Sequence, residues 1–153
     1  MRRSDKKIHN RKDLELIFHK AQVCRLGLCD EEVPYIVPVH FGYLDGCLYI
    51  HSASTGKKID LLKKNPKVCF EIDIDYRIHD STIPCDFSTS YQSIIGFGTA
   101  TIVTNDKEKR HALEILIDHY ASGKTYEFSK EKVKRVAIIK ITIEHMTGKR
   151  SKK

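Results

Sequence analysis

This sequence of 153 residues contains no tryptophan, and no apolar run in it approaches the roughly 20 residues that a helix needs to cross a bilayer. The basic residues at its start are followed by no apolar segment of the kind found in secretory signals. We therefore expect a cytoplasmic protein without a membrane span. The length is that of one domain, so residues 1–153 are expected to share a single core.

Cysteine and histidine are present without the spacing that would assign them to a framework or a metal site. The five cysteines are an odd number, and no two of them have CxxC spacing, which argues against disulfide bridges and a zinc knuckle. No two of the eight histidines are two or four residues apart. Paired metal ligands on one strand or helix need such spacing, so we expect no metal site.

The net charge of +7 is distributed in a way that argues against binding to nucleic acid. Much of the excess lies near the ends of the chain, in basic tails expected over about residues 1–9 and 147–153. Aromatic residues are not interleaved with these charges, as a surface that stacks on bases would require. The positive charge is better suited to attracting a small anion.

The most informative stretch is residues 49–66, which predicts a strand, a loop rich in hydroxyl groups and a short helix that ends before Pro66. Lys57 and Lys58 fall in the first turn of that helix, where free N–H groups already carry partial positive charge. Three hydroxyl residues stand close by: Ser52, Ser54 and Thr55. Because an anion would relieve this concentration of positive charge, the pattern predicts a phosphate site at the helix start.

The remaining sequence predicts six strands, two full helices and the short helix already described. The strands are expected over residues 24–29, 33–43, 47–51, 68–75, 91–104 and 136–143, where apolar and polar residues alternate. The full helices are expected over 10–21 and from Asn105 to Ser122, each with an asparagine as N-cap. Residues 76–88 are expected to form a loop, and the chain from Met146 onward a tail.

Two features suggest how these strands are arranged. Asp45-Gly46 is a strong two-residue hairpin signal, and the strands that it joins form part of an antiparallel meander. Gly96 and Gly98 interrupt the longest strand and predict a bulge at which it turns a corner. Short, numerous strands with glycine corners favour a small, closed or partly closed barrel.

Four blocks of sequence, in this order along the chain, resemble the nitroimidazole-resistance (Nim) family. They are VPVHFGY (37–43), YIHSA with GKK (49–53 and 56–58), YQSIIGFGTA (91–100) and IEHMTGK (143–149). That family belongs to the pyridoxamine phosphate oxidase-like FMN-binding split barrels. The resemblance implies a mainly β fold with flanking helices, in which a six-stranded antiparallel split barrel forms a homodimer and binds FMN between its subunits.

The resemblance also implies a role for particular residues. The FMN phosphate would be held by Ser52, Lys57 and Lys58, which agrees with the charge pattern described above. The flavin ring would lie along the main chain of Val39, His40, Phe41 and Gly42. Of the neighbours Gln92 and Ser93, which alternation places on opposite faces, Ser93 is the one expected to reach the ligand. His51 is the candidate for chemistry beside the flavin, since histidine changes charge near neutral pH.

The sequence departs from the pyridoxamine phosphate oxidases themselves, which end in a substrate-binding segment that contains tryptophan. We therefore expect a different activity: FMN-dependent reduction of a small electrophile, such as a nitroaromatic compound or a quinone, with NAD(P)H as the reductant to test. The alternative is a module without catalytic activity that binds flavin or haem. In that case His40, His51 or His145 would be the axial ligand of the haem iron.

Overall fold

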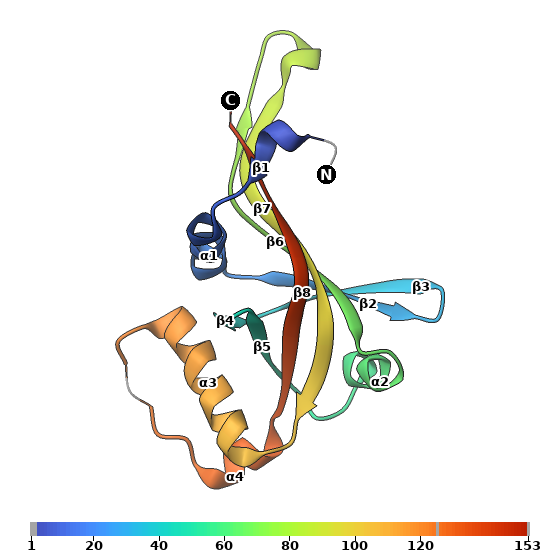
Figure 1. The fold of residues 1–153 in the computed structure, drawn as a ribbon, viewed down its shortest axis with the longest axis vertical. Coiled ribbons are helices and arrows are strands. Elements are labelled where there is room, and N and C mark those ends of the chain that lie inside the picture. The colour runs from blue at the N-terminus through green and yellow to red at the C-terminus, as the bar shows by residue number, and fades with distance from the viewer. Residues whose placement is uncertain (1–2, 125, 153) are drawn as a thin grey trace.

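The computed structural model describes residues 3–124 and 126–152, and over these residues it shows eight strands and four α-helices (Figure 1). Met1, Arg2 and Lys153, which belong to the expected tails, lie outside the described residues. The strands are β1 (Lys7–Ile8), β2 (Cys24–Asp30), β3 (Val33–Val39), β4 (Gly42–Leu44), β5 (Cys47–Ser52), β6 (Lys67–His79), β7 (Ser88–Val103) and β8 (Ala137–Ser151). The helices are α1 (Arg11–Lys20), α2 (Lys57–Lys64), α3 (Asp106–Ala121) and α4 (Lys130–Arg135), with two short 3-10 turns, η1 (Ser4–Lys6) and η2 (Pro84–Asp86).

The strands form one sheet in the order β3-β2-β6-β7-β8-β5-β4, with β1 added on β8, and every pairing is antiparallel. The two ends of this path are consecutive in the chain, because β3 ends at Val39 and β4 begins at Gly42. The sheet must therefore curl until its two edge strands, β3 and β4, are separated only by the link His40–Phe41. This is the split barrel with flanking helices that the sequence predicts.

The number of strands differs from the expected six for two reasons. The strand expected over residues 33–43 is broken at His40–Phe41 into β3 and β4. In addition, Lys7 and Ile8, expected in a tail, pair with Lys149 and Gly148 of β8. Neither change alters the class of fold.

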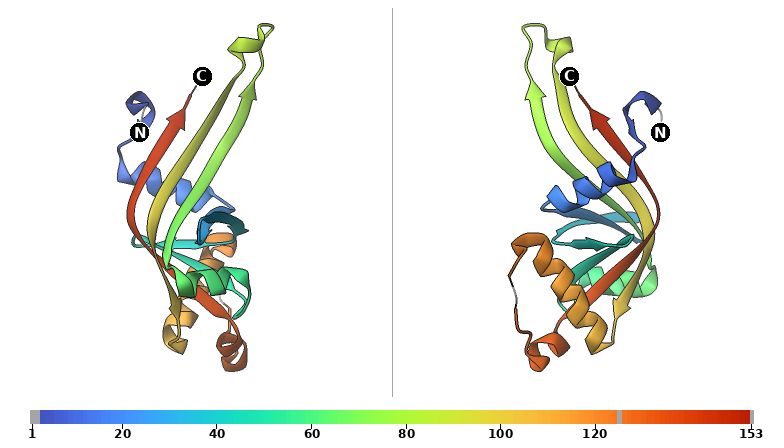
Figure 2. Two further views of the ribbon diagram at one scale, coloured as in Figure 1. Left: turned by 90° about the vertical axis from the view of Figure 1, so that its right-hand side faces the viewer. Right: turned by 60° about the vertical axis from the view of Figure 1, so that its left-hand side comes forward.

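Strands β6, β7 and β8 run past the body of the barrel as an arm (Figure 2). The expectation of a loop over residues 76–88 is wrong, because β6 continues to His79 and β7 begins at Ser88. Outside the barrel the strands need no alternating buried residues, and they are held by ladder pairing such as Ile78 with Thr89. Only η2 and its flanks remain as the turn at the tip.

The expected tail after Met146 is also wrong, since β8 continues to Ser151 and pairs with both β7 and β1. Ser151 is buried, with 7% of the residue exposed, and its hydroxyl accepts a hydrogen bond of 2.9 Å from Lys6 Nζ. Gly148 lies so close to Leu14 of α1 that a Cβ there would collide with the leucine side chain. The polar composition of residues 146–151 gave no signal for this end of β8, which packs against Leu14 of α1 at Gly148.

The expected bulge at the glycine corner is confirmed. The register of β7 against β8 shifts between Phe97 and Gly98. A Cβ at Gly96 would collide with the buried ring of Phe70, and one at Gly98 with the carbonyl oxygen of Thr142. Both glycines therefore permit close approach of the neighbouring strands β6 and β8 at this corner.

The helices cover the open parts of the barrel, and both expected full helices are confirmed with their caps. Asn10 accepts a hydrogen bond from Lys12 N at 3.0 Å, and Asn105 accepts bonds from the first turn of α3. α1 places Phe18 against the ring of Tyr43, with the centroids 4.1 Å apart, which anchors the helix to the core. α4 was not anticipated. Over the described residues no helix is long and apolar enough to span a membrane.

Candidate functional site

Two of the predicted site residues, His40 and His51, line one cleft of about 330 Å³. His40 comes from the link between β3 and β4, and His51 from the end of β5. The other lining residues come from α3 and the segment after it: Leu116, Ile117, Tyr120, Ala121 and Tyr126. The cleft therefore combines two imidazole rings with a mainly apolar and aromatic wall, which suits a flat organic molecule.

Tyr120 fixes the position of the link that carries His40. Its hydroxyl accepts a hydrogen bond from Phe41 N at 3.0 Å and donates one to the carbonyl oxygen of Gln22 at 3.0 Å. Its ring meets the ring of His40 edge-on, with the centroids 5.1 Å apart. Burial raises the pKa of Tyr120, so the hydroxyl keeps its proton at neutral pH. Tyr120 was not anticipated as a site residue.

The segment along which the flavin ring was predicted to lie, residues 39–42, is only partly available to a ligand. The side chains of Val39 and Phe41 are buried in the core, so only their main chain can meet a ligand. The Phe41 N–H group is already bonded to Tyr120. Gly42 lies against α3, since a Cβ there would be 2.8 Å from Cγ2 of Ile115. Of these four residues, His40 is the one whose side chain faces the cleft.

The predicted phosphate site lies at the start of α2, and its two lysines differ. Lys57 Nζ is 3.1 Å from Asp30 Oδ2 and lies 5.1 Å from the centroid of the Tyr35 ring. Asp30 therefore already offsets the charge of Lys57. Neither Asp30 nor Tyr35 was anticipated here, because they reach Lys57 from the β2–β3 hairpin, far away in sequence.

Lys58 is half-buried, and this burial lowers the pKa of its ammonium group. Within the described part of the chain, no carboxylate lies within 4.0 Å of it. The helix begins after Gly56, and no side chain caps its first N–H groups. Nearby Ser52 is 7% exposed, while the adjacent His51 is exposed. Lys58 thus adds a charge that no close carboxylate offsets to an uncapped helix start, although Asp60 in the first turn and Asp30 beside Lys57 reduce the total positive charge there.

Ser93 lies away from the histidine cleft. It is on β7, opposite Asp73 of β6 and Lys149 of β8, at the base of the arm. The side chain of its neighbour Gln92 donates to Asp75 Oδ2 at 2.8 Å and accepts from Arg150 Nε at 2.8 Å. Within one chain, Ser93 therefore does not join His40 and His51, and its role stays a prediction.

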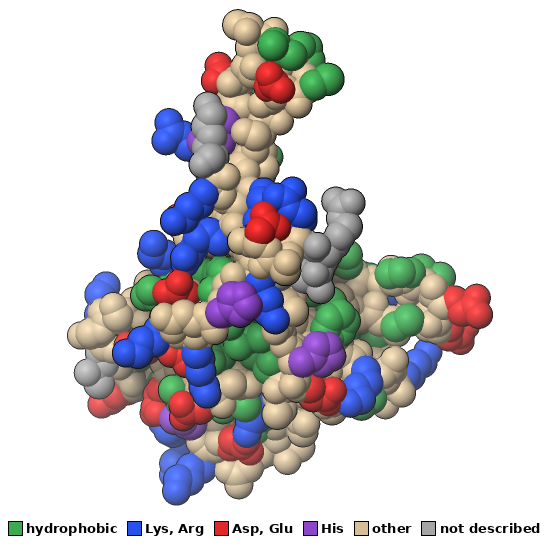
Figure 3. Space-filling model, turned by 45° about the horizontal axis from the view of Figure 1, so that its top comes forward, with side chains coloured by type: hydrophobic (Ala, Val, Ile, Leu, Met, Phe, Trp, Pro, Cys, Tyr) green, Lys and Arg blue, Asp and Glu red, His purple; other side chains and the backbone are tan. Residues whose placement is uncertain are grey.

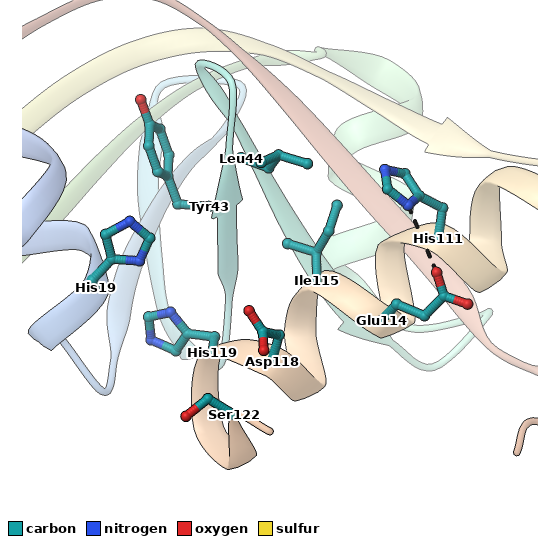
Figure 4. A pocket seen from close by; sticks show the side chains of 9 residues that line it. All are labelled: His19, Tyr43, Leu44, His111, Glu114, Ile115, Asp118, His119 and Ser122. Carbon is teal, nitrogen blue, oxygen red and sulfur yellow. Dashed lines mark ion pairs between the residues drawn. The ribbon is translucent and has the colours of Figure 1, made fainter. Parts of the chain in front are cut away.

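His145, the third histidine considered as a haem ligand, also lies elsewhere. Its ring stacks on Phe97, with the centroids 4.8 Å apart. Another cavity, drawn in Figure 4, contains none of the predicted site residues. It has a volume of about 520 Å³ between α1, β4 and α3, and His19, His111 and His119 line it together with Glu114 and Asp118. Over the described residues, no cluster of three or more such side chains is arranged to hold a metal ion.

The fold and the cleft that His40 and His51 line define the class of protein. It is an antiparallel split barrel with a basic helix start and with two histidines beside an apolar wall. Residues 10–150 match the family model described as pyridoxamine 5'-phosphate oxidase, and the chain belongs to that family. The resemblance found in the sequence is thereby confirmed.

Two relatives are similar to this chain in sequence. A crystal structure of a protein assigned to 5-nitroimidazole antibiotic resistance, from Bacteroides thetaiotaomicron, is 32% identical to this chain. That similarity covers 94% of this chain and 86% of the other, with a TM-score of 0.84. An uncharacterised protein of Rhizobium meliloti is 32% identical over 66 residues, and the chain spans only 43% of that relative's length.

More distant structures share the fold. The FAD and haem binding protein from Mycobacterium smegmatis is 18% identical, with a TM-score of 0.88 over 97% of this chain and 74% of that one. A flavocytochrome from Azotobacter vinelandii is 15% identical, with a TM-score of 0.87 over 100% of this chain and 72% of that one. At such identities the likeness concerns the fold alone.

Proposed function

We propose that this protein binds FMN and uses it to reduce a small electrophile such as a nitroaromatic compound, for example a nitroimidazole, or a quinone. The observation that carries the proposal is Lys58, a half-buried ammonium group at an uncapped helix start. Membership of the family and the similarity to a 5-nitroimidazole resistance protein support a flavin as the ligand. When bound, the flavin supplies the redox chemistry, and the protein supplies binding and orientation.

The residues present fit the two ends of such a cofactor. A phosphate ester at the start of α2 would offset the charge of Lys58 and accept bonds from the free N–H groups of the first turn. Lys57 would contribute less than the sequence suggests, because Asp30 already pairs with it. At the other end, the main chain near His40 and the cleft beyond it can hold a flat ring. The proposed order along the ligand is therefore phosphate at α2 and ring at the link.

His51 is the proposed proton donor. Its imidazole is exposed, and the cleft that it lines has room for a small aromatic substrate. Reduction of a nitro group or a quinone consumes protons as well as electrons, and a histidine can deliver a proton near neutral pH. His40 lies in the link between β3 and β4, where its ring packs edge-on against Tyr120 of α3, and it would position the substrate rather than deliver the proton.

We also propose that the protein is a homodimer, in which a second copy covers the arm. Large apolar side chains on the outer part of the arm are 54% to 63% exposed, and Figure 3 shows hydrophobic groups at its tip. They are Tyr76, Ile78, Ile83 and Phe87. Exposed apolar groups gathered in this way favour an interface. Ser93, at the base of the same arm, would then contact the ligand held by the partner.

An absorption spectrum of the purified protein, combined with mass spectrometry of the released ligand, tests the proposal. Twin flavin bands and the mass of FMN are expected, and NAD(P)H oxidation should accelerate when a nitroaromatic acceptor is added. His51→Gln should keep the flavin and slow that reaction. A protein that binds FMN but transfers no electrons to nitroaromatics or quinones would contradict the catalytic part.

A second candidate, a haem-binding module, is favoured by one observation: His40 and His51 line the same apolar cleft. Imidazole is a common axial ligand of haem iron, and apolar walls suit the porphyrin. A Soret band that disappears in both His40→Ala and His51→Ala would support this candidate. His145, which stacks on Phe97 away from the cleft, provides the control substitution.

A further inference from the structure

A second basic pocket lies where α2, α3 and α4 meet the end of β7 and the start of β8. Its volume is about 240 Å³. Each of the three helices contributes one lysine to the lining: Lys63, Lys109 and Lys134. The hydroxyl residues Ser54 and Thr104 complete the polar part of the wall, and no acidic residue is among the lining residues.

The charge of this pocket is not offset within the described chain. Elsewhere lysines pair with carboxylates, as Lys57 does with Asp30 at 3.1 Å and Lys140 with Glu108 at 3.5 Å. For the three pocket lysines, no carboxylate of the described residues lies within 4.0 Å. Lys109 Nζ instead donates to the carbonyl oxygen of Val136 at 3.0 Å, which holds that ammonium group in place. Three like charges in one recess favour the binding of an anion.

The floor of the pocket is apolar and thus selects among anions. It consists of Ile59, Ile102, Val103, Val136 and Ala137. Such a floor forms no hydrogen bonds with a hydrated ion, but it can contact a small organic group and remove its apolar surface from water. Lysine is a common ligand for phosphate, which it binds as a point charge. A phosphate ester with a short organic part matches both halves of the pocket.

This pocket is separate from the proposed phosphate site at the start of α2. Lys57 and Lys63 are six residues apart, and a rotation of about 100° per residue places them on different sides of the helix. Lys57 faces Asp30 and Tyr35 of the β2–β3 hairpin. The pocket lies instead against α3 and α4.

We infer that the pocket between α2, α3 and α4 is an anion site for a small phosphate monoester. Lys63, Lys109 and Lys134 bind the phosphate, and the apolar floor contacts the organic part. The inference does not depend on the proposed function, because the three lysines on which it rests are not part of the proposed flavin site.

Isothermal titration calorimetry tests this inference. The protein is used as purified, with any bound flavin retained, in a buffer free of phosphate. The probes are inorganic phosphate and phenyl phosphate. The test variant is Lys63→Gln with Lys134→Gln, which leaves the anchored Lys109 intact. The matched control is Lys64→Gln with Lys132→Gln, which removes the same charge from the same two helices outside the pocket.

Saturable binding of phenyl phosphate is expected, tighter than that of inorganic phosphate. The dissociation constant should rise about tenfold or more in the test variant and less than about twofold in the control. Equal weakening in both variants would show a general effect of net charge and overturn the inference, as would an absence of binding to the wild type.

The flavin content of the same preparations separates this inference from the proposed function. The test variant should retain its flavin. If it loses flavin while Lys58→Ala retains it, the pocket is the seat of the flavin phosphate, and a separate site is excluded. If Lys58→Ala loses flavin and phosphate binding persists, both assignments stand.

Discussion

Tyr120 shows how one side chain can hold the proposed site together. It bonds both the Phe41 N–H group and the Gln22 carbonyl, and thereby ties α3 to the link and to the chain before β2. Its ring also supports that of His40. Nothing in the sequence singles out this tyrosine, because its partners become neighbours only when the barrel has curled.

Tyr120→Phe should therefore destabilise the protein by about 1–3 kcal/mol, since it leaves the buried Phe41 N–H group without a partner. The free energy of unfolding in urea measures this. Tyr126→Phe, in the same cleft, is the control and should change stability by less than about 0.5 kcal/mol. Equal effects of the two substitutions would contradict the positioning role of Tyr120.

His119 links acid stability to the packing of α3. Burial lowers the pKa of His119, and the proximity of His19 adds to this, while the bond to Ala21 and the charge of Asp118 act in the opposite direction. The neutral ring, which donates from Nε2 to Ala21 O at 2.7 Å, is thus the form that the folded state prefers. The unfolded chain binds the proton more readily.

The stabilising contribution of neutral His119 is complete above its ordinary pKa of about 6.5 and is lost as the pH falls toward the lower folded-state value. The stability advantage of the wild type over His119→Gln should therefore shrink between pH 7.5 and pH 5.0, as measured by urea unfolding at each pH. An advantage that is constant or grows in acid would contradict the assignment.

At the scale of elements, helices and strands were predicted correctly where one of their faces is buried, because burial leaves a periodic pattern of apolar residues in the sequence. α1 and α3 have asparagine caps and apolar stripes, and both were predicted closely. The extension of β6 and β7 beyond the barrel and the end of β8 were missed. Those segments are strands because of ladder pairing, and their polar or irregular sequences carry no periodic signal.

The glycine corner is the element whose sequence signal had a clear physical cause. Gly96→Ala should cost about 1–3 kcal/mol, because its methyl group would collide with the Phe70 ring in the core. Phe70→Leu alone is destabilising, but in the Gly96→Ala background it should cost less, since the smaller side chain makes room. A double-mutant cycle by urea unfolding measures this coupling. Strict additivity would show that the two residues do not compete for space.

For the whole molecule, the class of fold and its family were available from the sequence, but the geometry of the site was only partly so. The basic start of α2 was predicted correctly as an unusual charge arrangement. The pairing of Lys57 with Asp30, which leaves Lys58 as the principal cation, was not predictable. It depends on how the β2–β3 hairpin lies beside α2, and that is set by curling of the whole sheet.

Assembly also belongs to this scale. If a second copy covers the arm, Ile78→Asp with Phe87→Asp should convert the dimer to a monomer in sedimentation velocity experiments, because it places charge in an apolar interface. Val33→Asp, an equally exposed position on the β2–β3 hairpin, is the control and should remain dimeric. A monomeric wild type at micromolar concentration would refute the proposed homodimer.

The most direct measurement is the amount of FMN that copurifies with each of two variants, determined from the flavin absorbance per chain. Lys58→Ala should lose most of its FMN, because it removes the half-buried cation at the uncapped start of α2. Lys64→Ala, an exposed lysine at the other end of the same helix, should retain it. Full FMN occupancy in Lys58→Ala would contradict the proposed phosphate site.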